Sequence, residues 1–235
     1  MKLTDQHIEQ LYKFTRQHFV EHYDVQTELV DHLANDIEQI WKENPTLTFE
    51  QARDKSFKKF GVFGFMDVVE EKQGQMNKKY FKIILGFVKE WFSIPRILLP
   101  ITMFYCFYFL LQFPFAQYLF PGFFFTILII EFIVMFKKRK ILNAKFKKTE
   151  KKWMLEDIIE TQGHGNIVLV LFYVFQFLTP NSYESLSTLN SIIIAVATTF
   201  VFIIGYVSLV VVPKKAEKLL DEHYPEYRLV NPTTI

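Results

Sequence analysis

The side chains best suited to chemistry gather in the segment ELVDHLAND, where acidic residues surround one histidine. Glu28, His32 and Asp36 follow one another at intervals of four residues, so on a helix they share one face. Carboxylate and imidazole groups on one face are able to bind zinc. The segment lacks the H-E-x-x-H and Glu-x-x-His pairs that hold metals on helices. We therefore favour the solvated face of an amphipathic helix over a metal site.

Several motifs that would indicate catalysis are absent from the sequence. There is no Walker motif, no G-x-G-x-x-G and no G-x-S-x-G. The single cysteine, Cys106, excludes a disulfide or a cysteine-based zinc site within one chain. A membrane enzyme with its site near His164, in the segment 150–165, stays a minor alternative. We expect no enzymatic activity, no catalytic residue, no metal and no cofactor.

The composition indicates a membrane protein. Hydrophobic residues make up 50% of the chain and aromatic residues 17%, with 27 phenylalanines. A soluble domain of this size has no room to bury so much apolar surface, and lipid is the obvious partner for it. Charged residues are 22% overall but are concentrated in a few segments, which keeps the mean hydropathy at only +0.12. The net charge of +2 indicates no direct nucleic-acid binding.

Four apolar stretches predict membrane-spanning helices, at about 94–113, 118–136, 166–179 and 189–212. About 20 apolar residues in a helix cross roughly 30 Å of hydrocarbon, and the third stretch is short by this measure. Glu131 lies inside the second stretch, and an ionisable residue there is a candidate functional group. The simpler interpretation, which we favour, is that Glu131 reaches a lysine at the boundary, such as Lys137.

The distribution of basic residues predicts the orientation. The expected loop 137–165 is rich in lysine, whereas the turn between the first two stretches has no charge. Lys and Arg near span ends stay on the cytosolic side. This loop, both termini and the tail 213–235 are therefore expected in the cytosol. The same residues are candidates for contact with anionic lipid, although their role in topology alone accounts for them; they are Lys137, Lys138, Arg139, Lys140, Lys147 and Lys148.

Residues 1–75 predict a small cytosolic helical domain, so the expected fold class is all-α, with this domain preceding a four-helix transmembrane bundle. A second helix from near Asp24 carries an apolar stripe at helical spacing, and Thr48 with Gln51 forms a capping box that starts a third. Residues 76–93 predict an amphipathic helix at the membrane surface, or else a further core helix of the domain. The stripe of the second helix consists of Val25, Leu29, Val30, Leu33, Ile37, Ile40 and Trp41.

The N-terminal segment resembles the HAAS-type signalling domain, a short helical module that precedes membrane spans and is often linked to PadR-like transcription regulators. The resemblance covers about residues 5–72 and is carried by Glu28-Leu29-Val30-Asp31-His32, Ile37-Glu38, Leu47 to Ala52, and Phe60-Gly61. It implies a non-enzymatic sensor or accessory protein of the bacterial inner membrane.

The partners that the resemblance implies are the lipid bilayer and a cytosolic regulator or another membrane subunit. Candidate partner-binding residues are Glu28, Asp31, His32 and Asp36. A small transporter or exporter subunit remains the alternative function.

Overall fold

The computed structural model describes residues 2–162 and 187–227, and every regular element within these ranges is helical. Extended pairing among them is limited to an isolated bridge between His22 and Lys152. The chain divides into two compact units. The N-terminal unit contains the described residues up to Lys78 together with Thr149–Leu155, and the second unit contains Lys79–Lys148 and the described residues from Glu156 onward. The expected third span, 166–179, and His164 lie outside the described residues.

Two of the first three helices of the N-terminal unit, α1 and α3, begin at capping boxes. Helix α1 (Asp5–Gln17) starts after Thr4, whose side chain accepts from the backbone of His7 in a capping box. Helix α2 (Tyr23–Glu43) ends at Asn44, directly before Pro45. Helix α3 (Phe49–Phe57) starts with the predicted capping box of Thr48 and Gln51, with hydrogen bonds of 3.3 and 3.1 Å.

The core of the N-terminal unit forms along α2, which packs against both α1 and α3. Every residue of the predicted apolar stripe on α2, from Val25 to Trp41, is buried. A short 3-10 helix, η1 (Lys58–Phe60), follows α3, and Gly61 after it takes a left-handed conformation with φ of 81°. Such a conformation favours glycine, which explains why the chain turns at this point.

Helix α4 (Met66–Trp91) runs without a break through the boundary that we expected between residues 75 and 76. The stretch holds no proline, and a single glycine inside a helix costs only about 1 kcal/mol relative to alanine. The helix therefore continues through Gly74 and Gly86, and the expected juxtamembrane helix 76–93 is the C-terminal part of a longer element.

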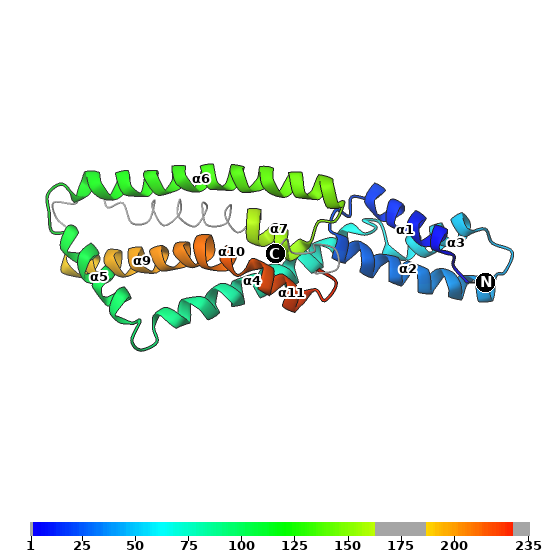
Figure 1. The fold of residues 1–235 in the computed structure, drawn as a ribbon, viewed down its shortest axis with the longest axis horizontal. Coiled ribbons are helices and arrows are strands. Elements are labelled where there is room, and N and C mark those ends of the chain that lie inside the picture. The colour runs from blue at the N-terminus through cyan, green and yellow to red at the C-terminus, as the bar shows by residue number, and fades with distance from the viewer. Residues whose placement is uncertain (1, 163–186, 228–235) are drawn as a thin grey trace. The chain divides into compact units, whose positions relative to one another are not determined.

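The second unit holds the apolar helices of the chain. They are α5 (Leu98–Leu110), α6 (Ala116–Thr149) and α9 (Thr188–Tyr206), and α5 packs closely against α9 (Figure 1). Helix α9 continues through η3 (Val207–Val211), a π-helical turn, into α10 (Val212–Lys214), and α11 (Ala216–His223) follows. Two short elements, α7 (Met154–Asp157) and the π-helical η2 (Ile158–Gln162), precede the part that is not described.

Two of the described helices are long and apolar enough to cross a membrane, Tyr118–Thr149 and Thr188–Lys214, rather than the four that we expected. Helix α5 has 13 residues, which span only about 20 Å. Residues 94–97, which we expected within the first span, form a turn with a cis bond between Ile94 and Pro95.

The segment 137–149 is also not a loop, because α6 continues through it. Lysine, arginine, leucine and alanine are all good helix formers, and this stretch contains no glycine or proline.

Candidate functional site

A short segment after α6 belongs to the N-terminal unit and not to the helices that precede it. We call Thr149–Leu155 the clasp segment. Its Trp153 side chain is only 2% exposed, and Met154 and Leu155 are fully buried. The ring of Trp153 meets that of Tyr23 edge to face, with 5.2 Å between the centroids. Residues that follow a candidate membrane-spanning helix thus pack against the start of α2.

Polar contacts fix the clasp segment to the start of α2. The backbone N–H of Tyr23 donates to the carbonyl of Lys152 at 2.7 Å, which makes the isolated bridge. The N–H of Met154 donates to the Asp24 carboxylate at 3.2 Å. Three contacts with basic side chains surround these bonds: Lys152 with Glu21 at 3.2 Å, Arg16 with Glu150 at 3.8 Å, and the Lys151 ammonium 4.1 Å from the Tyr23 ring centre.

Sequence reasoning missed the clasp segment, because its lysines were assigned to the topology of the expected loop. The signal that could have revealed it is the apolar run Trp153-Met154-Leu155 directly after a lysine-rich stretch. A tryptophan has a large apolar surface, which is often buried against other side chains.

The four candidate partner-binding residues all lie on α2 but have different surroundings. Glu28, Asp31 and His32 are exposed. The Glu28 carboxylate pairs with Lys72 at 2.8 Å, and the His32 ring lies 5.5 Å from that of Phe60. These exposed side chains form a small acidic surface that we call the α2 face, defined by Glu28, Asp31 and His32.

Asp36 is set back from the α2 face and has a structural role. Its carboxylate accepts from Lys59 at 2.5 Å. Burial tends to raise the pKa of the Asp36 carboxyl, but the nearby ammonium of Lys59 outweighs this effect and holds the pKa below its usual range. Asp36 thus ties α2 to η1. Among residues 2–162 and 187–227, no group of three or more histidine, cysteine or acidic side chains is placed to hold a metal ion.

The apolar helices of the second unit place large apolar side chains outward and polar ones inward. Glu131 on α6 is only 1% exposed, and α9 buries Ser191, Thr198 and Thr199. By contrast Tyr118 is 75% exposed and Phe136 60%. In a water-soluble protein the opposite distribution is usual.

The expected contact between Glu131 and Lys137 does not follow from the helix. Six residues along α6 correspond to a rotation of about 240°, and Glu131 is buried whereas Lys137 is exposed. Glu131 therefore belongs to the interior of the unit.

The basic residues of α6 divide between two faces of the helix. Lys138 and Lys145 share one face, which meets two carboxylates: Lys138 pairs with Glu160 and Lys145 with Glu156, both at 2.5 Å. The hydroxyl of Tyr227 lies 2.9 Å from Lys145 and 3.1 Å from Glu156. Burial raises the pKa of Tyr227, partly offset by the ammonium of Lys145.

The remaining candidate lipid-binding residues point away from this network. Lys137, Lys140, Lys147 and Lys148 recur at helical spacing on another face of α6 and are exposed, as is Arg139. The continuous helix therefore concentrates basic side chains on one exposed surface, while Lys138 is engaged by Glu160.

Comparisons with known proteins find no match to this chain among protein-family models, curated proteins or solved structures. The functional conclusion therefore depends on the residues and contacts described above.

Proposed function

We propose that this chain is an integral membrane protein with four spans and with both termini in the cytosol. The observation that carries the proposal is the outward apolar surface of the second unit, combined with its buried Glu131 and its buried serines and threonines. Exposing this apolar surface to water would cost about 25 cal/mol of free energy for each Å². Lipid removes that cost. The exposed side chains include Leu98, Tyr105, Phe109, Tyr118, Phe125, Ile129, Ile133, Phe136, Leu189 and Phe200.

The basic segments of the second unit support the orientation. Lys138 on α6 and Lys214 at the end of α10 line the same cleft, so the lysine-rich ends of both candidate spans lie at one end of the unit. Retention of lysine and arginine on the cytosolic side then places this end inside the cell. The first and third spans of this proposal are α5 with its flanking residues and the stretch 166–179.

The proposed role is that of a non-enzymatic sensor or accessory protein of the HAAS type. Its N-terminal unit binds a cytosolic regulator or another membrane subunit through the α2 face. Two features support a coupling role. The chain enters the second unit along α4, and it returns through the clasp segment after α6. A change in the spans is thereby connected to the N-terminal unit at two places.

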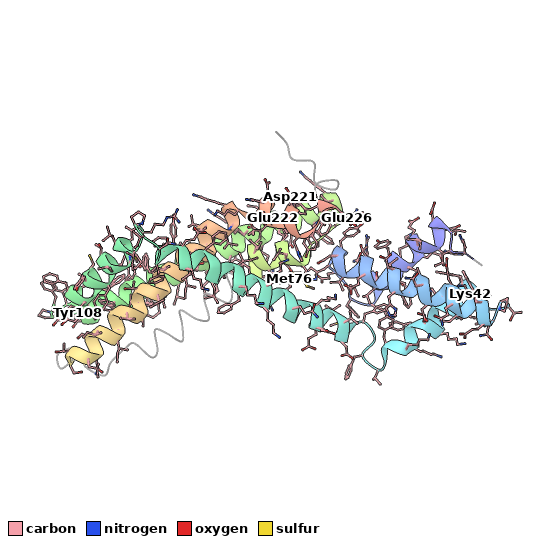
Figure 2. All side chains as sticks on the ribbon, turned by 90° about the horizontal axis from the view of Figure 1, so that it is seen from below. Lys42, Met76, Tyr108, Asp221, Glu222 and Glu226 are labelled. Carbon is pink, nitrogen blue, oxygen red and sulfur yellow. The ribbon has the colours of Figure 1, made fainter. Side chains whose placement is uncertain are left out.

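The partner role is tested by site-specific photo-crosslinking of the full-length protein in its own cells. A photoreactive residue at Asp31, on the α2 face, is expected to give one dominant adduct, which mass spectrometry identifies. The matched control is the same residue at Lys42, which lies near the end of α2 (Figure 2). An absence of adducts at Asp31, or equal adducts at both positions, would count against a binding surface on the α2 face.

A small transporter or exporter subunit is the second candidate function, and the buried Glu131 favours it. A carboxylate inside a span is able to carry protons or to bind cations. The measurement is ion or proton flux in vesicles that contain only this protein. A flux that decreases in the Glu131→Gln variant would support transport. A flux no greater than that of protein-free vesicles would exclude it.

A further inference from the structure

A cleft of about 330 Å³ lies in the second unit, near the ends of its apolar helices and beside basic residues. It lies between the end of α4, the turn before α5 and the end of α9 with η3. Its lining combines two cations, one carboxylate, two aromatic rings that carry polar groups, and apolar side chains. The volume suits a small charged group. The lining residues that carry the argument are Arg96, Lys215, Glu90, Trp91, Tyr206 and Phe87.

The cations leave donors available in this cleft. Arg96 uses one guanidinium nitrogen, Nη1, for Glu90 at 2.9 Å, and its other donors do not take part in this ion pair. The Lys215 ammonium lies 4.3 Å from the centre of the Phe87 ring. In the parts of the chain that the structure describes, Lys215 has no carboxylate partner. The cleft therefore has an excess of one positive charge.

The π-helical turn η3 helps to bring Lys215 to the cleft. Tyr206 and Lys215 are nine residues apart, and in a regular α-helix this separation places two side chains on roughly opposite faces. A π turn contains about one additional residue, so the residues after η3 are rotated by about 100° relative to those before it. Tyr206 and Lys215 consequently line the same cleft.

An aromatic pair indicates at which level of the membrane the cleft lies. The rings of Trp91 and Tyr206 meet edge to face, with 5.5 Å between their centroids. Tryptophan and tyrosine are enriched where headgroups meet hydrocarbon. Arg96 precedes α5, and Lys215 directly follows the last candidate span. Leu99 and Val211 add apolar walls to the same cleft.

We propose that this cleft binds the phosphate of an anionic phospholipid from the cytosolic leaflet. Lys215 and the free donors of Arg96 hold the phosphate oxygens, Trp91 and Tyr206 lie beside the headgroup, and Leu99 and Val211 contact the first part of an acyl chain. Basic pockets between membrane helices on the cytosolic side are suited to such headgroups. The lipid is favoured over a free phosphate because apolar walls would add nothing to the binding of a small soluble anion.

This inference rests on the proposed membrane location, and it concerns residues other than the exposed lysines of α6. The experiment measures lipid binding to the full-length protein in detergent by native mass spectrometry. The probes are phosphatidylglycerol and phosphatidylcholine with the same acyl chains. We expect phosphatidylglycerol to bind about fivefold more tightly for each cation that contacts it.

The variants separate a specific site from general attraction. Lys215→Gln and Arg96→Gln are each expected to weaken phosphatidylglycerol binding about fivefold, and Lys215→Arg is expected to retain it. The matched control, Lys218→Gln, removes an exposed lysine on α11 and should change binding less than twofold. Equal loss in Lys215→Gln and Lys218→Gln would overturn the site.

Three further outcomes are decisive. Displacement of the lipid by an equal concentration of glycerol phosphate would show that the site recognises a soluble phosphate and would overturn the lipid assignment. A protein that needs detergent but binds both lipids equally would refute this inference alone. A protein that is stable without detergent would refute the membrane location as well.

Discussion

The clasp segment makes a sharp prediction, because its largest side chain, that of Trp153, is buried and contacts the start of α2. In Trp153→Ala the large indole that covers Tyr23 is removed from a position that is only 2% exposed. Large-to-small substitutions of a buried tryptophan typically cost about 3–5 kcal/mol. The cost depends on how far the surrounding chain relaxes into the vacated space, and we expect the lower end of this range, about 3 kcal/mol.

Hydrogen exchange of the full-length protein in detergent measures this change where it should occur. The amide of Tyr23 donates to Lys152, and that of Met154 donates to Asp24, so both depend on the clasp segment. A loss of about 3 kcal/mol corresponds to exchange that is roughly 100-fold faster at these amides. Peptides that cover the start of α2 and the clasp segment should both show it.

The control replaces another aromatic residue close by in sequence. Phe146→Ala removes an exposed ring of α6, so we expect a change of less than about 0.5 kcal/mol and unaltered exchange at Tyr23. If Trp153→Ala left the exchange of Tyr23 within threefold of the unsubstituted protein, the clasp segment would not hold the N-terminal unit, and the proposed coupling would lose its support.

Two further substitutions test the N-terminal unit. Gly64 has a φ of 57°, and a Cβ atom there would lie 2.8 Å from the Phe57 ring. Gly64→Ala should therefore destabilise the unit by about 1–3 kcal/mol, whereas Gly74→Ala in the open part of α4 should not. Thermal unfolding of both variants tests this. Asp36→Asn should cost about 1 kcal/mol at neutral pH. Because the folded-state pKa of Asp36 is lowered, its contribution is complete above the unfolded value of about 3.9 and is lost as the pH falls through the folded value. The difference between Asp36→Asn and the unsubstituted protein should therefore shrink as the pH falls below about 3.9 and disappear once Asp36 is protonated in the folded protein. A difference that stays constant throughout the acid titration would contradict the ion pair with Lys59.

The elements that the sequence predicted well are those with local signals. The stripe of α2 has helical periodicity, and the capping box of Thr48 and Gln51 needs only residues that are three apart. Both features depend only on residues that are close in sequence, so the folded chain contains them as predicted. The left-handed Gly61 likewise follows from a local rule.

Some of the missed features depend on contacts between residues that are distant in sequence. The others are helices that continue because no residue ends them. The clasp segment reaches α2 from about 130 positions further along the chain, and no periodicity within either segment predicts that meeting. The long α4 and α6 were divided at changes in composition, although nothing in their backbones ends the helix there. For the candidate site, the sequence identified His32 and its acidic neighbours. It did not predict that Glu28 pairs with Lys72 and Asp36 with Lys59, because both lysines lie on other elements.

Cysteine accessibility in intact cells tests the membrane topology most directly. With Cys106→Ser as the background, single cysteines replace Phe115, in the turn between α5 and α6, and Lys42 on α2. A membrane-impermeant maleimide should label position 115 in intact cells and position 42 only after lysis. Labelling of position 42 in intact cells, or release of the protein from membranes by an alkaline wash, would contradict an integral membrane protein with cytosolic termini.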